Sequence, residues 1–203
     1  MNIYCWNTEF QDRVKAYYKN YNADTQMIGD VKVNWIITPS DNNAYQNGLD
    51  EALTNPTDET RVDLFLCEAD YAQKYTIDGV AMDISKLLSA DDIKDQYKYT
   101  QDVVTSDGVM RGISWPACPG VMFYRRDIAK EVFGSDDPAE VQKQVADWGK
   151  FDTAAAALNK AGYTILPGYD DTYRAFSNNV SKPWVDGTKI QVDDQINAWV
   201  EQT

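Results

Sequence analysis

Residues 107–128, DGVMRGISWPACPGVMFYRRDI, hold the pattern that decides how this chain is organised. The pair Asp107-Gly108 predicts a turn, and apolar residues on either side of a bend of small residues predict strands over 110–114 and 121–124. A helix is expected to begin at Asp127. A chain that crosses from one lobe of a protein to another needs this order, and it leaves aromatic side chains at the crossing.

Before this segment, apolar runs alternate with segments of helical periodicity. The run VDLFLC at residues 62–67 is almost continuously apolar, which is typical of a central parallel strand buried on both faces. Strands that alternate with helices favour a doubly wound parallel sheet, so the chain is predicted to be an α/β protein. The expected strands are 2–6, 31–37 and 62–67, and the expected helices are 8–18, 41–53 and 68–75.

The remaining sequence is mainly of helical character, with one further strand expected over 163–166. Residues 86–103 are also expected to be mostly helical. Thr8 and Asp137 are expected to cap helices, because their side-chain oxygens can accept hydrogen bonds from the free N–H groups of a first turn. The later helices are expected over 128–133, 138–145, 151–160, 172–178 and 192–200.

The charge balance narrows the classes of partner. The 203 residues are 43% hydrophobic and carry a net charge of −13, which indicates an acidic globular protein and disfavours nucleic acid and anionic membranes as partners. There is no histidine, the commonest metal ligand and general base. The sequence lacks a calcium-loop pattern as well, so we expect no metal and no cofactor.

The cysteines give no metal or redox motif. Cys5, Cys67 and Cys118 show no CxxC spacing. Cys5 and Cys67 end two apolar runs, so we expect buried thiols on neighbouring strands, while a disulfide between them stays open. No apolar run reaches the roughly 18 residues of a membrane helix, and no signal peptide is present in this chain.

Residues 107–128 resemble the hinge-crossing segment of the extracellular solute-binding proteins of ABC transporters, of the carbohydrate, maltose-binding type. Other stretches resemble the family in the correct order along the chain. At the start of the helix after the crossing, Arg125-Arg126-Asp127 shares only its Asp with the family's Asn-Lys-Asp triplet. The matching stretches are 68–71 (EADY), 77–84 (IDGVAMDI), 148–162 (WGKFDTAAAALNKAG) and 168–176 (GYDDTYRAF).

The resemblance implies a periplasmic-binding-protein-like fold, with a parallel-sheet lobe that has helices on both faces and a second, incomplete α/β lobe. The expected domains are residues 1–110 for lobe 1 and residues 111–203 for the hinge crossing and part of lobe 2. Such proteins are usually longer, so the usual C-terminal half is expected to be missing. Exposed sheet edges would then favour self-association.

The resemblance also implies a function. The protein would bind an extracellular mono- or oligosaccharide in a cleft between lobes, close around it by a hinge, and deliver it to the membrane permease of an ABC importer. It would be a lipoprotein in an extracellular, cell-surface or periplasmic location. Neither catalysis nor a cofactor is implied.

Candidate ligand contacts follow from the chemistry of sugars. Hydroxyl groups need carboxylates or amides, and the apolar faces of pyranose rings stack on aromatic side chains. In open α/β sheets such groups bind ligands where parallel strands end. The candidates are Trp6, Asn7, Asp41, Asn42, Glu68, Asp70, Tyr71, Trp115, Tyr124, Asp170, Asp171 and Tyr173.

Each candidate also has a structural explanation. Ser40 or Asp41 could cap a helix, and acids such as Glu68 and Asp70 are favoured in a first helical turn by the helix dipole. The Asp170-Asp171 pair can likewise cap a helix. The aromatic candidates could pack in the core or at the hinge.

Other functions stay open. A polyamine or another small solute would suit an acidic, aromatic site through cation–π contacts. A truncated or engineered domain could act as a scaffold that self-associates and has no role in transport. Paired carboxylates are also the machinery of glycosidases, although neither a histidine nor a nucleophile elbow is present.

Overall fold

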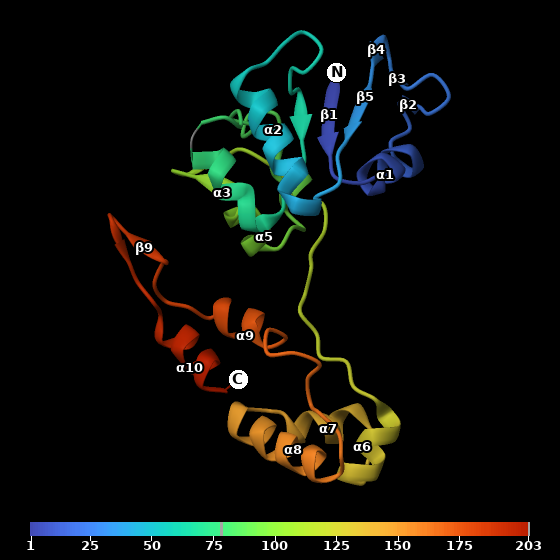
Figure 1. The fold of residues 1–203 in the computed structure, drawn as a ribbon. Helices are drawn as coiled ribbons and strands as arrows, with labels where there is room; N and C mark the ends of the chain where they lie inside the picture. Colours follow the sequence, from blue (N-terminus) through green and yellow to red (C-terminus); the bar gives the residue numbers. More distant parts are fainter. Residues whose placement is uncertain (78, 203) are drawn as a thin grey trace. The chain divides into compact units, whose positions relative to one another are not determined.

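The computed structural model describes residues 1–77 and 79–202. The chain forms two compact units, Met1–Ala117 (unit 1) and Cys118–Thr203 (unit 2), and each is described by itself (Figure 1). Asp78 of the stretch 77–84 and Thr203 at the end of the predicted second lobe lie outside the described residues.

Unit 1 contains a three-stranded parallel sheet in the order β5-β1-β6. Strand β1 (Asn2–Cys5) pairs along its whole length with β5 (Asn34–Ile37), and β6 (Leu64–Phe65) pairs with Ile3 and Tyr4. Mixed helix and parallel sheet confirm the predicted α/β class. The run at 62–67 was predicted to be a central strand buried on both faces, and this is wrong. It forms only the two-residue strand β6, at the edge of the sheet, with Leu64 exposed.

Helices pack on this sheet on both sides. From α2 (Ala44–Thr54) and α3 (Ala69–Ile77), the buried residues Leu49 and Tyr75 pack against Tyr4 of β1. Side chains alternate across a strand, so Trp35, the neighbour of Ile36 in β5, points to the other face. There its ring contacts Phe10 of α1 (Glu9–Tyr17), with a centroid separation of 6.2 Å.

Small antiparallel elements complete unit 1. Three two-residue strands, β2 (Tyr21–Asn22), β3 (Met27–Ile28) and β4 (Val31–Lys32), form an antiparallel meander that was not predicted. The last of them, β4, consists of the first two residues of the expected strand 31–37. The hairpin β7–β8 turns at Asp107-Gly108, where φ is +51° and +75°, which confirms the predicted turn. The remaining elements are β7 (Thr105–Ser106), β8 (Val109–Met110), α4 (Ala90–Ile93) and α5 (Lys98–Asp102).

Unit 2 is built mainly of helices, as Figure 1 shows for its yellow-to-red part. Phe151, Ala154 and Leu158 bury one face of α8, and Phe176 of α9 and Ile196 of α10 are also buried. The hairpin formed by β9 (Val185–Asp186) and β10 (Lys189–Ile190) lies between α9 and α10 in sequence. The helices are α6 (Arg126–Phe133), α7 (Pro138–Gln144), α8 (Trp148–Lys160), α9 (Tyr173–Ser177) and α10 (Asp194–Gln202).

Several predicted elements are wrong. Strands were predicted over 110–114, 121–124 and 163–166. Within the ranges that the structure describes, only Met110 of these residues lies in a strand, β8. A strand needs a neighbour for its N–H and C=O groups, and a pattern of apolar residues does not supply one. The segment 86–103 is helical only in α4 and α5, because loops and turns separate these short elements.

The predicted caps have different outcomes. Asp137 caps α7 as expected, because its Oδ1 accepts from the backbone N–H of Ala139 at 2.8 Å. Thr8 does not cap α1. Its hydroxyl donates to Asp12, while the side chain of Asn7 accepts from the backbone N–H of Glu9 at 2.9 Å.

The remaining features considered in the sequence are the cysteines, membrane helices and metal sites. Cys5, Cys67 and Cys118 are free thiols, and burial raises the pKa of Cys67 to about 11, so that thiol stays protonated at neutral pH. No helix among the described residues is both long and apolar enough to cross a membrane. In the same part of the chain, no group of three or more Cys, Asp and Glu side chains could hold a metal ion.

Candidate ligand-binding site

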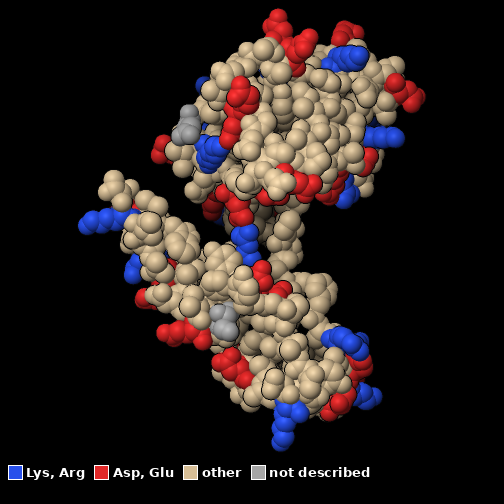
Figure 2. Space-filling model, viewed as in Figure 1, with Lys and Arg blue, Asp and Glu red and all other residues tan. Residues whose placement is uncertain are grey.

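The unit 1 candidates follow the ends of the parallel strands. Trp6 follows β1, Asp41 follows β5, and Glu68 follows β6. Parallel strands end at the same edge of a sheet, so the backbone brings the segments that carry these side chains to one edge. Figure 2 shows acidic side chains along the edge of unit 1 at which β1 and β5 end in Figure 1.

Trp6 and Tyr71 are held by the core beneath this edge. Both are half-buried and pack against the cluster that contains Tyr45 and Leu49. The Trp6 ring meets the Tyr45 ring edge-on at a centroid distance of 5.5 Å. The sequence left open whether these aromatic side chains pack in the core or contact a ligand. Trp6 and Tyr71 pack against the core and also keep some exposed surface.

Tyr45 was expected only on the apolar face of a helix, and the structure gives it a further role. Its hydroxyl lies 2.5 Å from the carbonyl oxygen of Leu66 and 3.1 Å from that of Tyr4. Burial raises its pKa, so the hydroxyl remains a donor. Tyr45 thus joins α2 to two neighbouring strands and fixes the support on which Trp6 lies.

The polar candidates at this edge are exposed. Asp41 and Asn42 lie in the 3-10 turn η1 (Asp41–Asn43), not in the first turn of a regular helix as predicted. Asn42 and Asn43 have φ of +52° and +59°, in a left-handed region that asparagine tolerates better than most residues. Ser40 makes no side-chain cap there, since its buried hydroxyl has no hydrogen-bond partner among the described residues.

Glu68 and Asp70 open α3 as predicted. Asp70 lies in the first turn, the carbonyl oxygen of Glu68 accepts from the backbone N–H of Tyr71 at 2.9 Å, and both carboxylates are exposed. The helix dipole favours acids at this position. The exposure of Glu68 also leaves its carboxylate accessible to a ligand.

Trp115 lies on a different aromatic group of unit 1. Its ring is 43% exposed and packs against Phe10 of α1 at a centroid distance of 6.0 Å. Phe10 also contacts Trp35, whose indole N–H donates to the hydroxyl of Tyr21 at 3.0 Å. The aromatic candidates of unit 1 are therefore supported by two groups, one around Tyr45 and one around Phe10.

Three of the unit 2 candidates lie together, Asp170 and Asp171 in the loop before α9 and Tyr173 at its first residue. Asp170 and Asp171 are exposed, and their carboxylates fold over Gly168, where an added Cβ would lie 3.0 and 3.2 Å from their oxygens. Tyr173 is half-buried and meets Trp199 of α10 edge-on at 5.0 Å. The backbone N–H of Tyr173 donates to the carbonyl oxygen of Asp170 at 3.0 Å, so a turn connects the acids to the ring.

Tyr124 lies apart from this loop in sequence and has a structural contact. Its hydroxyl donates to the carbonyl oxygen of Asp136 at 3.0 Å, which ties the segment before α6 to the connection between α6 and α7. The side chain is half-buried. This contact matches the packing role that the sequence left open for Tyr124.

Comparison with known proteins decides the family. Residues 16–202 match the family model described as "Bacterial extracellular solute-binding protein". The chain belongs to this family. No curated protein and no solved structure matches the chain. The family binds solutes outside the cytoplasmic membrane for ABC transporters, and it is a family of binding proteins rather than enzymes.

For a solute-binding protein of this family, the arrangement offers rings fixed by packing beside carboxylates that remain exposed. Such groups can stack on an apolar face of a ligand and accept hydrogen bonds from its hydroxyl or ammonium groups. Asn7 is less available, because its side-chain oxygen already accepts from Glu9. Tyr169, which is 69% exposed in the same loop as Asp170, was not among the candidates although its motif contained it.

Proposed function

We propose that this protein binds an extracellular carbohydrate, a mono- or oligosaccharide, and delivers it to the permease of an ABC importer. The family supplies solute binding and ABC transport, and the proposal adds the class of solute. Unit 1 would serve as one lobe, and unit 2 as part of the other. The candidate contacts of unit 1 are Trp6, Glu68 and Tyr71, and those of unit 2 are Asp171 and Tyr173.

The observation that supports a sugar is the pairing of fixed rings with exposed acids. The core beneath Trp6 and Tyr71 holds these rings in place, so stacking on a sugar would cost little side-chain entropy. In unit 2, Tyr173 is held against Trp199 beside the exposed Asp171. Carboxylates can accept from neighbouring hydroxyl groups, which is the hydrogen-bonding pattern that a sugar ring presents.

A polyamine is the second candidate, and the charge of the protein favours it. The net charge is −13, and acidic side chains follow the edge of unit 1 at which β1 and β5 end (Figure 2). An ammonium group would pair with Glu68 or Asp70 and could approach the ring of Trp6 or Tyr71. Salt should then weaken binding strongly, whereas a neutral sugar should show little dependence on salt.

The test is thermal unfolding and calorimetric titration of the full chain with mono- and oligosaccharides and with spermidine. A ligand at about 100 times its Kd should stabilise the protein by about 2.7 kcal/mol. Asp171→Ala and Glu68→Gln each remove one carboxylate, in unit 2 and unit 1 respectively. Each should weaken sugar binding by about tenfold or more, as expected for loss of a charged hydrogen-bond partner.

Asp186→Ala is the matched control, since Asp186 is an exposed acid of the hairpin β9–β10 and is not a candidate contact. It should bind as the parent chain does. Stabilisation by spermidine but by none of the sugars would favour the polyamine. A folded sample that responds to neither, or equal sugar binding by all three variants, would contradict the proposal.

A further inference from the structure

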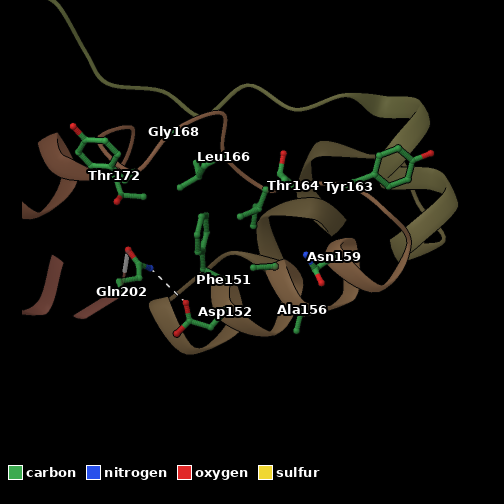
Figure 3. Close-up of a pocket in the computed structure, with 13 residues that line it drawn as sticks. Phe151, Asp152, Ala156, Asn159, Tyr163, Thr164, Leu166, Gly168, Thr172 and Gln202 are labelled. Atoms are coloured by element: carbon green, nitrogen blue, oxygen red, sulfur yellow. Dashed lines mark hydrogen bonds between the residues drawn. The ribbon is translucent and has the colours of Figure 1, made fainter. Parts of the chain in front are cut away.

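Unit 2 contains a cavity that none of the predicted contacts lines. Its volume is about 590 Å³, within the roughly 300–1,000 Å³ of pockets that hold small molecules. It is open to solvent, lies along α8 and is bordered by the segment 163–169 and by the end of α10. Figure 3 shows Phe151 and Leu166 facing each other across it, so part of its wall is apolar.

Two polar atoms at this cavity lack hydrogen-bond partners within the described residues. The hydroxyl of Thr172, a residue that is only 6% exposed, is one of them. The side-chain oxygen of Gln202 is the other, while the Gln202 amide nitrogen lies 3.5 Å from Asp152. Figure 3 shows Thr172 and Gln202 at the same end of the cavity.

Such atoms are unusual in folded proteins. More than about nine in ten buried polar groups have a partner, and leaving one without a partner costs roughly 1–3 kcal/mol. Thr172 can donate and accept, whereas the Gln202 oxygen can only accept. Both atoms are covered by neighbouring protein atoms, so a hydroxyl group would reach them only after a rotation of the Thr172 or Gln202 side chain. It would then accept from Thr172 and donate to Gln202.

We propose that this cavity binds a small neutral polyol the size of one sugar ring. One hydroxyl would join Thr172 and Gln202, and the C–H face of the ring would lie on Phe151 and Leu166. The exposed ring of Tyr169 also lines the cavity and offers a second apolar surface. Among the described lining residues Asp152 is the one formal charge, which disfavours anionic ligands.

This site goes beyond the proposed function, because it uses residues of unit 2 alone and none of the predicted contacts. Tyr169 and Thr172 of the loop before α9 line the cavity, whereas Asp171 of the same loop and Tyr173 of α9 do not. The loop would therefore serve two ligand surfaces. Variants at Asp171 and at Thr172 distinguish the two proposals.

The experiment is an NMR titration of the full chain with glucose, sorbitol and, separately, spermidine. Glucose and sorbitol should shift the side-chain amide signals of Gln202 and the backbone amide of Gly168. Thr172→Val removes the hydroxyl at nearly constant volume and should weaken binding about tenfold. Ala156→Phe places a ring at the cavity from an exposed position of α8 and should abolish binding while the fold is kept.

Thr153→Val is the matched control, because Thr153 lies on the exposed side of α8, does not line the cavity and donates to the carbonyl oxygen of Gly149. It should bind as the parent chain does. Because the hydroxyl lacks a partner without ligand, Thr172→Val should keep or raise Tm. A lower Tm together with unchanged glucose binding would mean that an ordered water fills the site, and would overturn the proposal.

Two further NMR results would overturn the cavity site. One is a signal shift at the Trp6 indole without a shift at Gln202, and the other is shifts with spermidine alone. Loss of glucose binding in Asp171→Ala but not in Thr172→Val would overturn the cavity site and leave the proposed function standing. The reverse result would support the cavity and count against Asp171 as a contact.

Discussion

In unit 1 the apolar run at 62–67 lies beside β1 and pairs with it through β6, whereas in unit 2 the run at 121–124 is similarly apolar and has no strand partner within the described residues. The two runs end in different environments. Phe65 packs on the core of unit 1, while Phe123 is 88% exposed. An apolar pattern therefore becomes a strand only where another strand satisfies its backbone groups.

A second difference concerns what forms each core. In unit 1 the helices α2 and α3 press a group of large side chains against the sheet. In unit 2, α8 buries Phe151, Ala154 and Leu158, and the other helices are shorter than α8. The comparison predicts that the two cores respond separately to mutation.

Leu49→Ala should have the largest effect and should affect unit 1. Leu49 is 1% exposed and lies in the cluster with Tyr4 and Tyr75, so its truncation leaves a cavity that costs about 2–5 kcal/mol. Hydrogen exchange measured by mass spectrometry should show lost protection in β1 and α2. Peptides from α8 should keep theirs.

Leu87→Ala is the control for this prediction, because Leu87 also belongs to unit 1 but is largely exposed. It should change stability by less than about 0.5 kcal/mol. Equal loss of protection in α8 and in α2 after Leu49→Ala would show that the cores are coupled, and the contrast between the units would no longer hold.

Tyr45→Phe should have an intermediate effect. It removes the hydroxyl that bonds to the carbonyl oxygens of Leu66 and Tyr4 and leaves these groups with one partner fewer, at a cost of about 1–3 kcal/mol. The ring contact with Trp6 is kept. Urea unfolding followed by Trp fluorescence measures the change, and Tyr97→Phe, at an exposed ring of unit 1, is the control. A Tyr45→Phe protein as stable as the parent would show that the hydroxyl does not hold the sheet.

Much of unit 1 could be predicted because its signals are local. The apolar run before Trp6, the helical spacing of Tyr45 and Leu49, and the Asp107-Gly108 turn are each visible over a few residues. The meander β2–β4 was missed because strands of two residues carry no period. In unit 2 the helices were predicted from caps and spacing. The strands predicted over 121–124 and 163–166 do not form, because no neighbouring strand among the described residues pairs with them.

The candidate site, like the fold, could be predicted from the sequence only in part. The chain order placed Trp6, Asp41 and Glu68 after parallel strands, and parallel pairing brings those ends to one edge. Whether each residue contacts ligand stays a prediction. Thr172 and Gln202 could not be found from sequence, because they are far apart in the chain and line one cavity only through the packing of α8, α9 and α10.

The smallest expected effect concerns the connection between a loop of unit 2 and α10. Asp193 joins a loop to the start of α10, since its carboxylate accepts from the backbone N–H groups of Gln195 and Ser181, both at 2.9 Å, and from that of Lys182 at 3.1 Å. Its hydrogen bonds to Gln195 and then Ser181 lower its pKa below the usual 3.8. A lowered folded-state pKa means that the ionised carboxylate stabilises the protein above about pH 4.

The contribution of the Asp193 carboxylate to the free energy of unfolding should disappear as pH falls through its folded-state pKa. Once it is protonated, the side chain no longer favours the folded state over the unfolded state. Asp193→Asn should therefore lower Tm at neutral pH, and the gap to the parent should narrow in acid. Asp194→Asn, an exposed neighbour in the first turn of α10, is the control and should show a smaller gap. Hydrogen exchange in α10 localises the change. A gap that is constant from neutral to acid pH would mean that the geometry of the side chain, rather than its charge, holds the loop to the helix.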